Sequence, residues 1–253
     1  MQRAKFRRVI VNRPNLRIPF PDGFADRLRG TIVEAVQRRG KYLVVALSSG
    51  ETLIMHLGMS GWFHVAPIGD RSREVDAHDH VVFMMSSGQS VVFNDPRRFG
   101  FMDLAPVAGD YPSLKAMGPE PLSPQFTADS LARACRGRKT AIKVTLLDQK
   151  VVGGLGNIYA SEALHHARVS PLRKAASIAT ITGKPKKDAV QLAASIKTVL
   201  TNAIRRSESP YRAGRFRVYE RAGGPCLRKG CAGTIRQITQ AARSTYYCPA
   251  CQR

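Results

Sequence analysis

The sequence predicts an α+β fold, with an N-terminal antiparallel β-sandwich, a helical region and a C-terminal β-hairpin built around a zinc ion. Three observations predict it. Short alternating apolar runs extend from Lys5 to about Leu104, helical patterns follow a proline cluster, and four paired cysteines lie near the end of the chain.

The predicted strands are short runs in which apolar and polar residues alternate. They are Arg8–Val11, Ile32–Val36, Tyr42–Leu47, Thr52–Leu57, His80–Met85, Val91–Phe93 and Phe99–Leu104. Ser49-Gly50 and Ser87-Gly88 lie between neighbouring runs, where hairpin turns are expected. We therefore expect an antiparallel β-sandwich over residues 1–107, with the charged stretch Asp70–Asp79 as an exposed loop.

A proline cluster separates the strands from the helices. It consists of Pro106, Pro112, Pro119, Pro121 and Pro124. Proline lacks a backbone N–H and has a fixed φ, so the cluster predicts a linker without regular structure over residues 108–125.

Helical patterns fill residues 126–212. Thr127 is a plausible N-cap for a helix over Ala128–Cys135, in which Cys135 is expected to be a small core residue. Further helices are predicted over Thr140–Gln149, Asn157–Ala167 and Asp188–Arg206. The last of them should bury a stripe at helical spacing. That stripe is Val190, Ala193, Ile196, Val199, Leu200 and Ala203.

A glycine-rich turn, Gly153-Gly154-Leu155-Gly156, precedes Asn157. It is not a nucleotide-binding P-loop, because no Lys-Ser/Thr pair follows it, and nothing around it supports a dinucleotide site. The unpaired N–H groups at a helix N-terminus are a natural seat for a phosphate, with Asn157 adding a side-chain donor. The alternative is a simple capped helix start.

Cys226, Cys231, Cys248 and Cys251 form a C-x4-C and a C-x2-C pair. This spacing predicts one structural Zn²⁺ held by four thiolates, and a segment as short as residues 213–253 needs such a metal in order to fold. The alternatives are a redox dithiol or two disulfides. Between the pairs, Thr234–Thr239 and Ser244–Tyr247 read as a β-hairpin, which places Arg243 at its tip.

The charge of the chain favours a polyanionic partner. Lys plus Arg number 40 and Asp plus Glu 18, so the formal net charge is +22. Nucleic acid is therefore a better candidate than an acidic protein or a membrane surface. The sequence shows no signal peptide and no apolar stretch that could span a bilayer, which predicts a cytoplasmic protein without a membrane partner.

Several segments together resemble the bacterial formamidopyrimidine-DNA glycosylase family. The resemblance runs from Lys5 to the end of the chain and includes the zinc hairpin. The matching segments are Arg38–Leu43, His56–Gly61, His78–His80, Asp95–Gly100, Gly118–Leu122, Lys139–Lys143 and Gly156–Glu162. It implies a β-sandwich, a helix-two-turn-helix domain and a zinc finger. It also implies removal of oxidised bases from duplex DNA, with strand cleavage at the abasic site.

The resemblance gives roles to residues of the N-terminal half. Met59, Arg97 and Phe99 match side chains that fill the gap left by an everted nucleotide. Lys41 matches a lysine that contacts phosphate and assists proton transfer during β-elimination. From the residues alone, Met59 and Phe99 are more typical of a core, and Arg97 and Lys41 of a solvated surface.

Further matching positions are expected to contact DNA. His78, Arg97 and Arg138 match DNA-contacting residues, and Lys143 and Asn157 lie in matching motifs near the DNA backbone. Arg243 matches an arginine linked to phosphate binding and δ-elimination. Its other interpretation is an ordinary turn residue.

The chain departs from the family pattern in two places. It begins Met1-Gln2-Arg3, whereas the family has an N-terminal proline nucleophile followed by a catalytic glutamate. We expect that translation has been assigned to an internal methionine, which an intact-mass measurement tests. The chain from Met1 is then expected to bind DNA without catalysis. The family's longer loop is replaced by the short segment Ser207–Arg215, which puts a preference for 8-oxoguanine in doubt.

The leading hypothesis is a monomeric base-excision repair enzyme that acts on damaged double-stranded DNA. It would remove formamidopyrimidines and possibly 8-oxoguanine, and cleave the strand by β,δ-elimination. One alternative is a truncated, non-catalytic protein that binds damaged DNA. Another is a zinc-ribbon module that binds RNA or the ribosome, which leaves Met59 and Arg97–Phe99 without a role.

Overall fold

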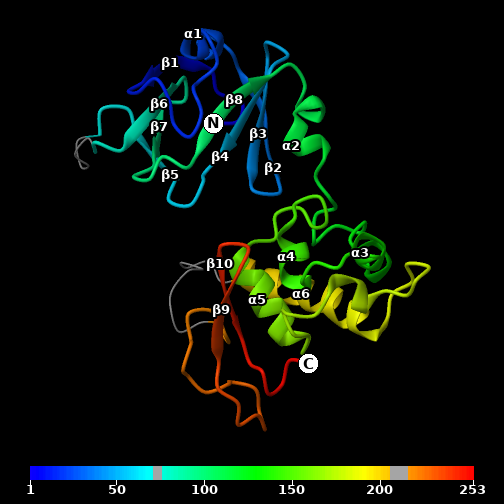
Figure 1. Ribbon diagram of the computed structural model, residues 1–253. Helices are drawn as coiled ribbons and strands as arrows, with labels where there is room; N and C mark the ends of the chain where they lie inside the picture. The colour runs from blue at the N-terminus through cyan, green and yellow to red at the C-terminus, as the bar shows by residue number, and fades with distance from the viewer. Residues whose placement is uncertain (71–75, 206–215) are drawn as a thin grey trace. The chain divides into compact units, whose positions relative to one another are not determined.

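The computed structural model of the protein describes residues 1–70, 76–205 and 216–253. The chain divides into two compact units, Met1–Lys115 and Ala116–Arg253 (Figure 1). The short segment Ser207–Arg215, whose length raised the question of lesion preference, lies outside the described residues.

The first unit is the expected antiparallel β-sandwich, built from two four-stranded sheets. One sheet has the order β1-β6-β7-β5, with β1 Phe6–Val11, β6 Asp79–Met85, β7 Gln89–Asn94 and β5 Trp62–Pro67. The other has the order β2-β3-β4-β8, with β2 Val33–Arg39, β3 Tyr42–Leu47, β4 Thr52–His56 and β8 Phe101–Ala105. Every pair of neighbouring strands is antiparallel.

Inward-facing side chains from both sheets form the core of the sandwich. Phe6 of β1 and Phe83 of β6 are fully buried, with ring centroids 5.4 Å apart. Val45, Leu53 and Met102 from the other sheet belong to the same apolar cluster. This core leaves the loops at the strand ends free to carry polar and exposed residues.

Two elements between β1 and β8 were not predicted. Strand β5 ends at Pro67 and has one buried residue, so its alternating pattern is weak. It forms because Trp62–Pro67 pairs with β7. Helix α1, Phe24–Leu28, is only five residues long and buries Phe24 and Leu28. Such a short helix has almost no periodicity to detect.

The expectation that prolines remove all regular structure between the domains is wrong. A 3₁₀ turn at Ala108–Asp110 and helix α2, Pro112–Lys115, form in this stretch. Pro112 is the first residue of α2, a position where the missing N–H would have had no helical partner.

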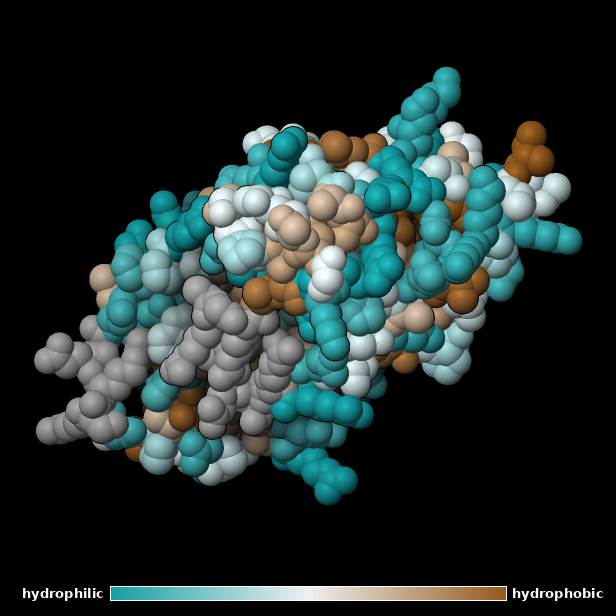
Figure 2. Space-filling model, turned by 90° about the horizontal axis from the view of Figure 1, so that it is seen from below, coloured by the Kyte–Doolittle hydropathy of each residue, from teal (hydrophilic) through white to brown (hydrophobic). Residues whose placement is uncertain are grey.

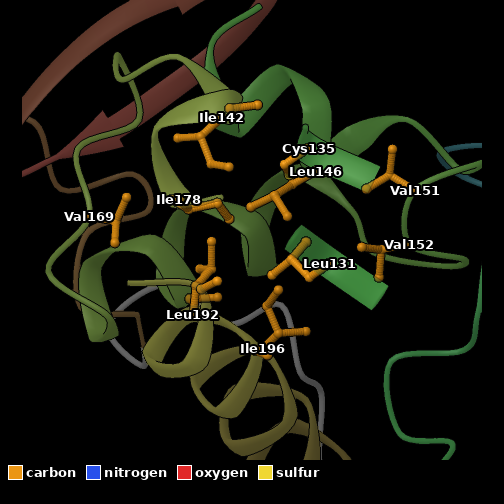
Figure 3. Packing of buried hydrophobic residues seen from close by; sticks show 14 of the residues in the cluster. Leu131, Cys135, Ile142, Leu146, Val151, Val152, Val169, Ile178, Leu192 and Ile196 are labelled. Atoms are coloured by element: carbon orange, nitrogen blue, oxygen red, sulfur yellow. The ribbon is translucent and has the colours of Figure 1, made fainter. Parts of the chain in front are cut away.

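The second unit begins with a helical core (Figure 3). Its helices are α3 Ala128–Cys135, α4 Ile142–Leu147, α5 Asn157–His166 and α6 Lys187–Arg205, with a 3₁₀ turn at Ala175–Ile178. Thr127 is the N-cap of α3 and forms a reciprocal capping box with Ser130. Cys135 is fully buried among Leu131, Leu146 and other apolar side chains, as predicted for a core cysteine.

The buried face of α6 is rotated relative to the predicted stripe. Val190 is 52% exposed, whereas Ala189 and Leu192 are fully buried. Ala193 and Ile196 belong to both the predicted and the observed stripe. Both choices have helical spacing, so the periodicity of the sequence could not separate them.

The finger hairpin consists of β9, Arg236–Gln240, and β10, Arg243–Tyr247. Ala241 and Ala242 form its turn and both have positive φ values of 47° and 58°. Gln240 and Arg243 pair across this turn, so Arg243 lies at the tip as expected. A small apolar cluster that includes Val218, Ile235 and Tyr246 supports the hairpin.

Hydrophilic side chains predominate on the molecular face shown in Figure 2, and hydrophobic residues are scattered among them. Within the ranges that the structure describes, none of the helices combines the length and the hydropathy that crossing a bilayer requires.

Candidate nucleic-acid interface and metal centre

Two loops of the first unit carry the predicted gap-filling side chains. Met59 follows β4 and is 74% exposed, and Phe99 precedes β8 and is 40% exposed. The Arg97 guanidinium carbon lies 4.7 Å from the centroid of the Phe99 ring, a cation–π contact. The structure therefore places Met59 and Phe99 at the surface instead of in the core. The Arg97 guanidinium lies over the Phe99 ring, and the Met59 side chain is largely exposed.

A buried carboxylate, Asp95, joins the two loops. Asp95 is fully buried, and its Oδ1 accepts a hydrogen bond from Ser60 Oγ at 2.5 Å. Its Oδ2 accepts from the Gly100 N–H at 2.8 Å. Ser60 Oγ also accepts from the Arg97 N–H at 3.3 Å. Asp95 thus holds Ser60, which follows Met59, and Gly100, which follows Phe99, in fixed positions relative to each other. This role was not predicted from the sequence.

Close backbone packing adds to this constraint. Gly58 has a φ of +67°, and a Cβ added there would lie 2.4 Å from the Phe99 carbonyl carbon. Only glycine allows the backbone of the Met59 loop to approach the Phe99 backbone so closely.

His78 and Lys41 lie near the same loops. The His78 carbonyl accepts from the Asp95 N–H at 3.1 Å, and the residue is exposed. Lys41 is exposed in the turn between β2 and β3. Burial, together with the charges of Lys41 and Arg17, lowers the pKa of His56. His56 Nδ1 accepts from the Gly58 N–H at 2.9 Å, so His56 supports the loop that carries Met59. The positive charge of Lys41 disfavours the protonated form of this histidine.

In the second unit, three predicted site residues meet at the finger hairpin: Lys143 and Asn157, expected to bind DNA, and Arg243, expected to assist δ-elimination. Lys143 Nζ of α4 donates to the Ser244 carbonyl at 3.0 Å and to Thr245 Oγ1 at 2.7 Å. Asn157 Nδ2, at the start of α5, donates to the same Ser244 carbonyl at 3.0 Å. Arg243, the residue before Ser244, is exposed. Two helices therefore fix the strand that presents Arg243.

The location of Lys143 does not agree with a direct contact to DNA. Its side chain is fully buried, and its amine donates to the hairpin. Burial, with a smaller contribution from the nearby charge of Arg243, lowers the pKa of Lys143 to about 8. The sequence motif did not reveal that the hairpin covers this face of α4.

The depressed pKa of Lys143 predicts a pH-dependent stability. The unfolded chain, with an ordinary lysine pKa near 10.5, binds more protons than the folded protein between about pH 8 and pH 10.5. The contribution of Lys143 to the unfolding free energy should therefore rise with pH through this window, by about 3 kcal/mol. Chemical denaturation of the wild type and of Lys143→Met at several pH values measures it. A difference between the two proteins that stays constant with pH would contradict the assignment.

The glycine-rich turn before α5 is organised by Gln149. Its Nε2 donates to the carbonyls of Leu147 and Leu155 at 3.0 and 3.1 Å, and its Oε1 accepts from the Gly154 N–H at 2.8 Å. Gln149 was not singled out from the sequence, because a polar residue at the end of a predicted helix is common. The turn leads to the N-terminus of α5, where unpaired N–H groups favour an anion.

Arg138 lies between α3 and α4 and forms an ion pair with Asp148, with Nη1 3.0 Å from Oδ2. Its side chain remains 40% exposed. The ion pair orients the guanidinium and leaves part of it accessible to a phosphate.

The four cysteines of the finger form a compact cluster whose Sγ atoms all lie within 4.8 Å of one another. The distance is 3.8 Å from Cys226 Sγ to Cys251 Sγ and 3.7 Å from Cys231 Sγ to Cys248 Sγ. A tetrahedron with metal–sulfur bonds of about 2.3 Å has edges of about 3.8 Å, so the cluster fits one Zn²⁺. These separations are far too long for disulfide bonds, and all four cysteines are free.

Glu162 of α5 connects the helical core to the start of the finger. Its Oε1 accepts from the N–H groups of Val218 and Tyr219 at 2.9 and 3.0 Å, and its Oε2 from Arg217 at 2.9 Å. Glu162 is buried. Hydrogen bonds to a charged acceptor are among the stronger ones, so this carboxylate anchors the segment that leads to the cysteines.

Comparison with known families divides the chain into three matching parts. Residues 1–102 match the formamidopyrimidine-DNA glycosylase N-terminal domain, and residues 117–213 match the formamidopyrimidine-DNA glycosylase H2TH domain. Residues 223–253 match the zinc finger found in FPG and IleRS.

Individual proteins agree with these matches. The chain is 48% identical to the formamidopyrimidine-DNA glycosylase of Rhodopseudomonas palustris strain BisA53, over 100% of this chain and 94% of that protein. It is 46% identical to the protein of the same name from Bradyrhizobium diazoefficiens, again over 100% and 94%.

Two solved structures share the fold. One is a complex of Lactococcus lactis Fpg with DNA containing an abasic site, with 27% identity, a TM-score of 0.86 and coverage of 100% of this chain and 94% of that one. The other is the MutM (Fpg) protein of Thermus thermophilus, with 32% identity, a TM-score of 0.81 and coverage of 100% and 92%.

Proposed function

The chain belongs to the formamidopyrimidine-DNA glycosylase family, and we propose that Met59, Arg97 and Phe99 fill the gap that opens when it everts a damaged nucleotide. The function of the family is base-excision repair: removal of oxidised purines from DNA, with cleavage of the resulting abasic site. DNA is the partner, and one structural Zn²⁺ is the cofactor.

A base stacked inside a duplex cannot reach an active site, so the enzyme must turn the nucleotide out and stabilise the vacancy. Met59 offers a deformable apolar chain, Phe99 an aromatic wedge and Arg97 a hydrogen-bond donor for the orphaned base. The observation that carries the proposal is their arrangement: Met59 and Phe99 are exposed on loops that buried Asp95 holds together, with Arg97 over the Phe99 ring.

The remaining residues are proposed to hold the DNA backbone. His78 and Lys41 lie close to the gap-filling loops of the first unit, and Lys41 would contact phosphate and assist proton transfer during β-elimination. In the second unit, Arg138 and Arg243 would bind phosphates, and Arg243 would assist δ-elimination. Lys143 and Asn157 would act through the hairpin, because their donors hold the residue next to Arg243.

The positive charge supports this proposal in a general way. A net charge of +22 supplies sequence-independent attraction to phosphates, which salt weakens. We further propose that the enzyme acts as a monomer in the bacterial cytoplasm. The chain covers 94% of the formamidopyrimidine-DNA glycosylases of two bacteria.

Binding to three ligands tests the proposal: a duplex with one central abasic-site analogue, the matched intact duplex and a structured RNA. We expect the abasic duplex to bind at least about tenfold more tightly than the intact one, because the cost of unstacking is already met in it. A preference for the RNA would contradict the proposal and favour an RNA-binding zinc module.

An incision assay addresses catalysis separately. The protein isolated from its own cells is incubated with an oligonucleotide duplex that carries one formamidopyrimidine, and the strand products are resolved by electrophoresis. Release of the damaged base and cleavage at its site are expected of the glycosylase. Tight binding without incision would favour a non-catalytic protein that binds damaged DNA.

A further inference from the structure

We propose that His165 of α5 is a positioning residue of the zinc centre, which donates a hydrogen bond from Nε2 to the thiolate of Cys226. His165 Nε2 lies 3.3 Å from Cys226 Sγ, within hydrogen-bond distance for sulfur. Both residues are buried, and they belong to different parts of the second unit: His165 to the helical core and Cys226 to the finger. The metal centre would then extend beyond its four ligands into helix α5.

The chemistry of the two groups fixes the direction of this bond. A thiolate that ligates zinc has no hydrogen, so it can only accept, and the ring nitrogen that faces it must carry the hydrogen. The other ring nitrogen, Nδ1, is buried and has no hydrogen-bond partner among the described residues. A neutral ring with its hydrogen on Nε2 satisfies the pair, whereas the opposite tautomer would point two lone pairs at each other.

Arg228 of the finger also forms hydrogen bonds with the end of α5. It lies two residues after Cys226, and its Nη2 donates to the carbonyls of His165 and His166 in the last turn of α5. The His165 carbonyl also accepts from the Arg168 N–H at 3.2 Å, and a cation such as Arg228 is favoured at a helix C-terminus. The finger and the end of α5 are therefore joined by hydrogen bonds in opposite directions, one from His165 and two from Arg228.

The same helix holds the finger at its other end. Asn157, the first residue of α5, donates to the Ser244 carbonyl of the hairpin, and Glu162 in its middle accepts the three N–H groups before the cysteines. Zinc binding is therefore coupled to α5 along the whole helix. Loss of the His165 bond should weaken metal binding, since outer-shell partners orient ligands and adjust their basicity.

Metal affinity in three variants tests the role of His165. Zinc is titrated away with a chromogenic chelator from wild type, His165→Leu and His165→Gln. We expect His165→Leu to bind zinc about 10- to 100-fold more weakly, and His165→Gln, whose amide N–H can reach the same sulfur, to recover most of the loss. His166→Leu is the matched control, because His166 Nδ1 pairs with Ser195 Oγ at 2.9 Å and not with a cysteine. It should retain wild-type affinity.

Cobalt(II) substitution gives a spectroscopic test that a purely structural role would not affect. A hydrogen bond stabilises the sulfur lone pairs, so its removal in His165→Leu should shift the sulfur-to-cobalt charge-transfer band to longer wavelength. Wild-type zinc affinity and an unshifted cobalt band in His165→Leu would overturn the proposal. So would equal effects in His165→Leu and His166→Leu.

A measurement on the wild-type protein decides the matter if a variant fails to fold. Long-range nitrogen–proton NMR spectra of the zinc-loaded protein identify the histidine tautomers. Hydrogen on Nε2 of His165 is expected, with scalar coupling to the metal after substitution with cadmium-113. Hydrogen on Nδ1 with Nε2 unprotonated would contradict the proposal, because no donor would then face the Cys226 sulfur.

Discussion

Replacing Cys248 with serine is expected to abolish zinc binding, unfold the finger and reduce DNA affinity by roughly two orders of magnitude. Cys248 is fully buried, and its Sγ lies 3.7 Å from that of Cys231 in the four-sulfur cluster. The apolar cluster of the finger is small, so metal ligation supplies most of its folding free energy, about 10–16 kcal/mol for a structural zinc. Without the finger, Arg243 loses the hairpin that presents it.

Zinc content, hydrogen exchange and DNA binding measure this result together. Exchange protection should disappear over residues 216–253 and persist over α3 to α6, whose core is separate from that of the finger. Cys135→Ala is the matched control, because Cys135 is a buried cysteine of that helical core. The control should keep one zinc per chain. A Cys248→Ser protein with a protected finger and unchanged DNA affinity would contradict the assignment.

Replacing Asp95 with asparagine is expected to destabilise the first unit by about 2–4 kcal/mol and to weaken binding to an abasic duplex roughly tenfold. The carboxylate accepts from both Ser60 Oγ and the Gly100 N–H. An amide has one oxygen, so its NH₂ group would face one of these donors and leave it unsatisfied. The loops that carry Met59 and Phe99 would then lose their common anchor.

Denaturation of the first unit and binding to abasic and intact duplexes separate the two effects. Asp103→Asn, the control, makes the same chemical change on β8, where the carboxylate accepts from the Leu104 N–H and forms a hydrogen bond with the Tyr111 side chain. We expect Asp95→Asn to lose affinity for the abasic duplex in particular. An equal loss in both variants, or none in Asp95→Asn, would show that Asp95 does not position the loops.

Residue patterns were sufficient to predict the architecture of each unit. Alternation in short runs indicates strands, and the two cysteine pairs indicate the metal, because both signals are local in the chain. Strand β5 and helix α1 were missed because their local signals are weak. Partners distant in the sequence stabilise both elements.

The sequence was less informative about the candidate site than about the fold. Exposed residues such as Met59 and Arg243 could be proposed as site residues from their resemblance to the family pattern. The groups that hold them could not, because the contact from Asp95 to Ser60 spans 35 residues and that from Lys143 to Thr245 spans 102. A buried charge that accepts or donates across such distances looks in the sequence like any other polar residue. Lys143 illustrates this, since its motif suggested a DNA contact and its burial shows a contact with the hairpin.

The most direct measurement of the central idea is the affinity of the triple variant Met59→Ala, Arg97→Ala, Phe99→Ala for an abasic duplex and for its intact counterpart. Arg98→Ala, which removes one charge from the same segment, is the control. If these side chains fill the vacancy, the triple variant should bind the abasic duplex about 30- to 1,000-fold more weakly, a loss of about 2–4 kcal/mol. Its affinity for the intact duplex should change little more than that of the control. Unchanged affinity for the abasic duplex would contradict the account.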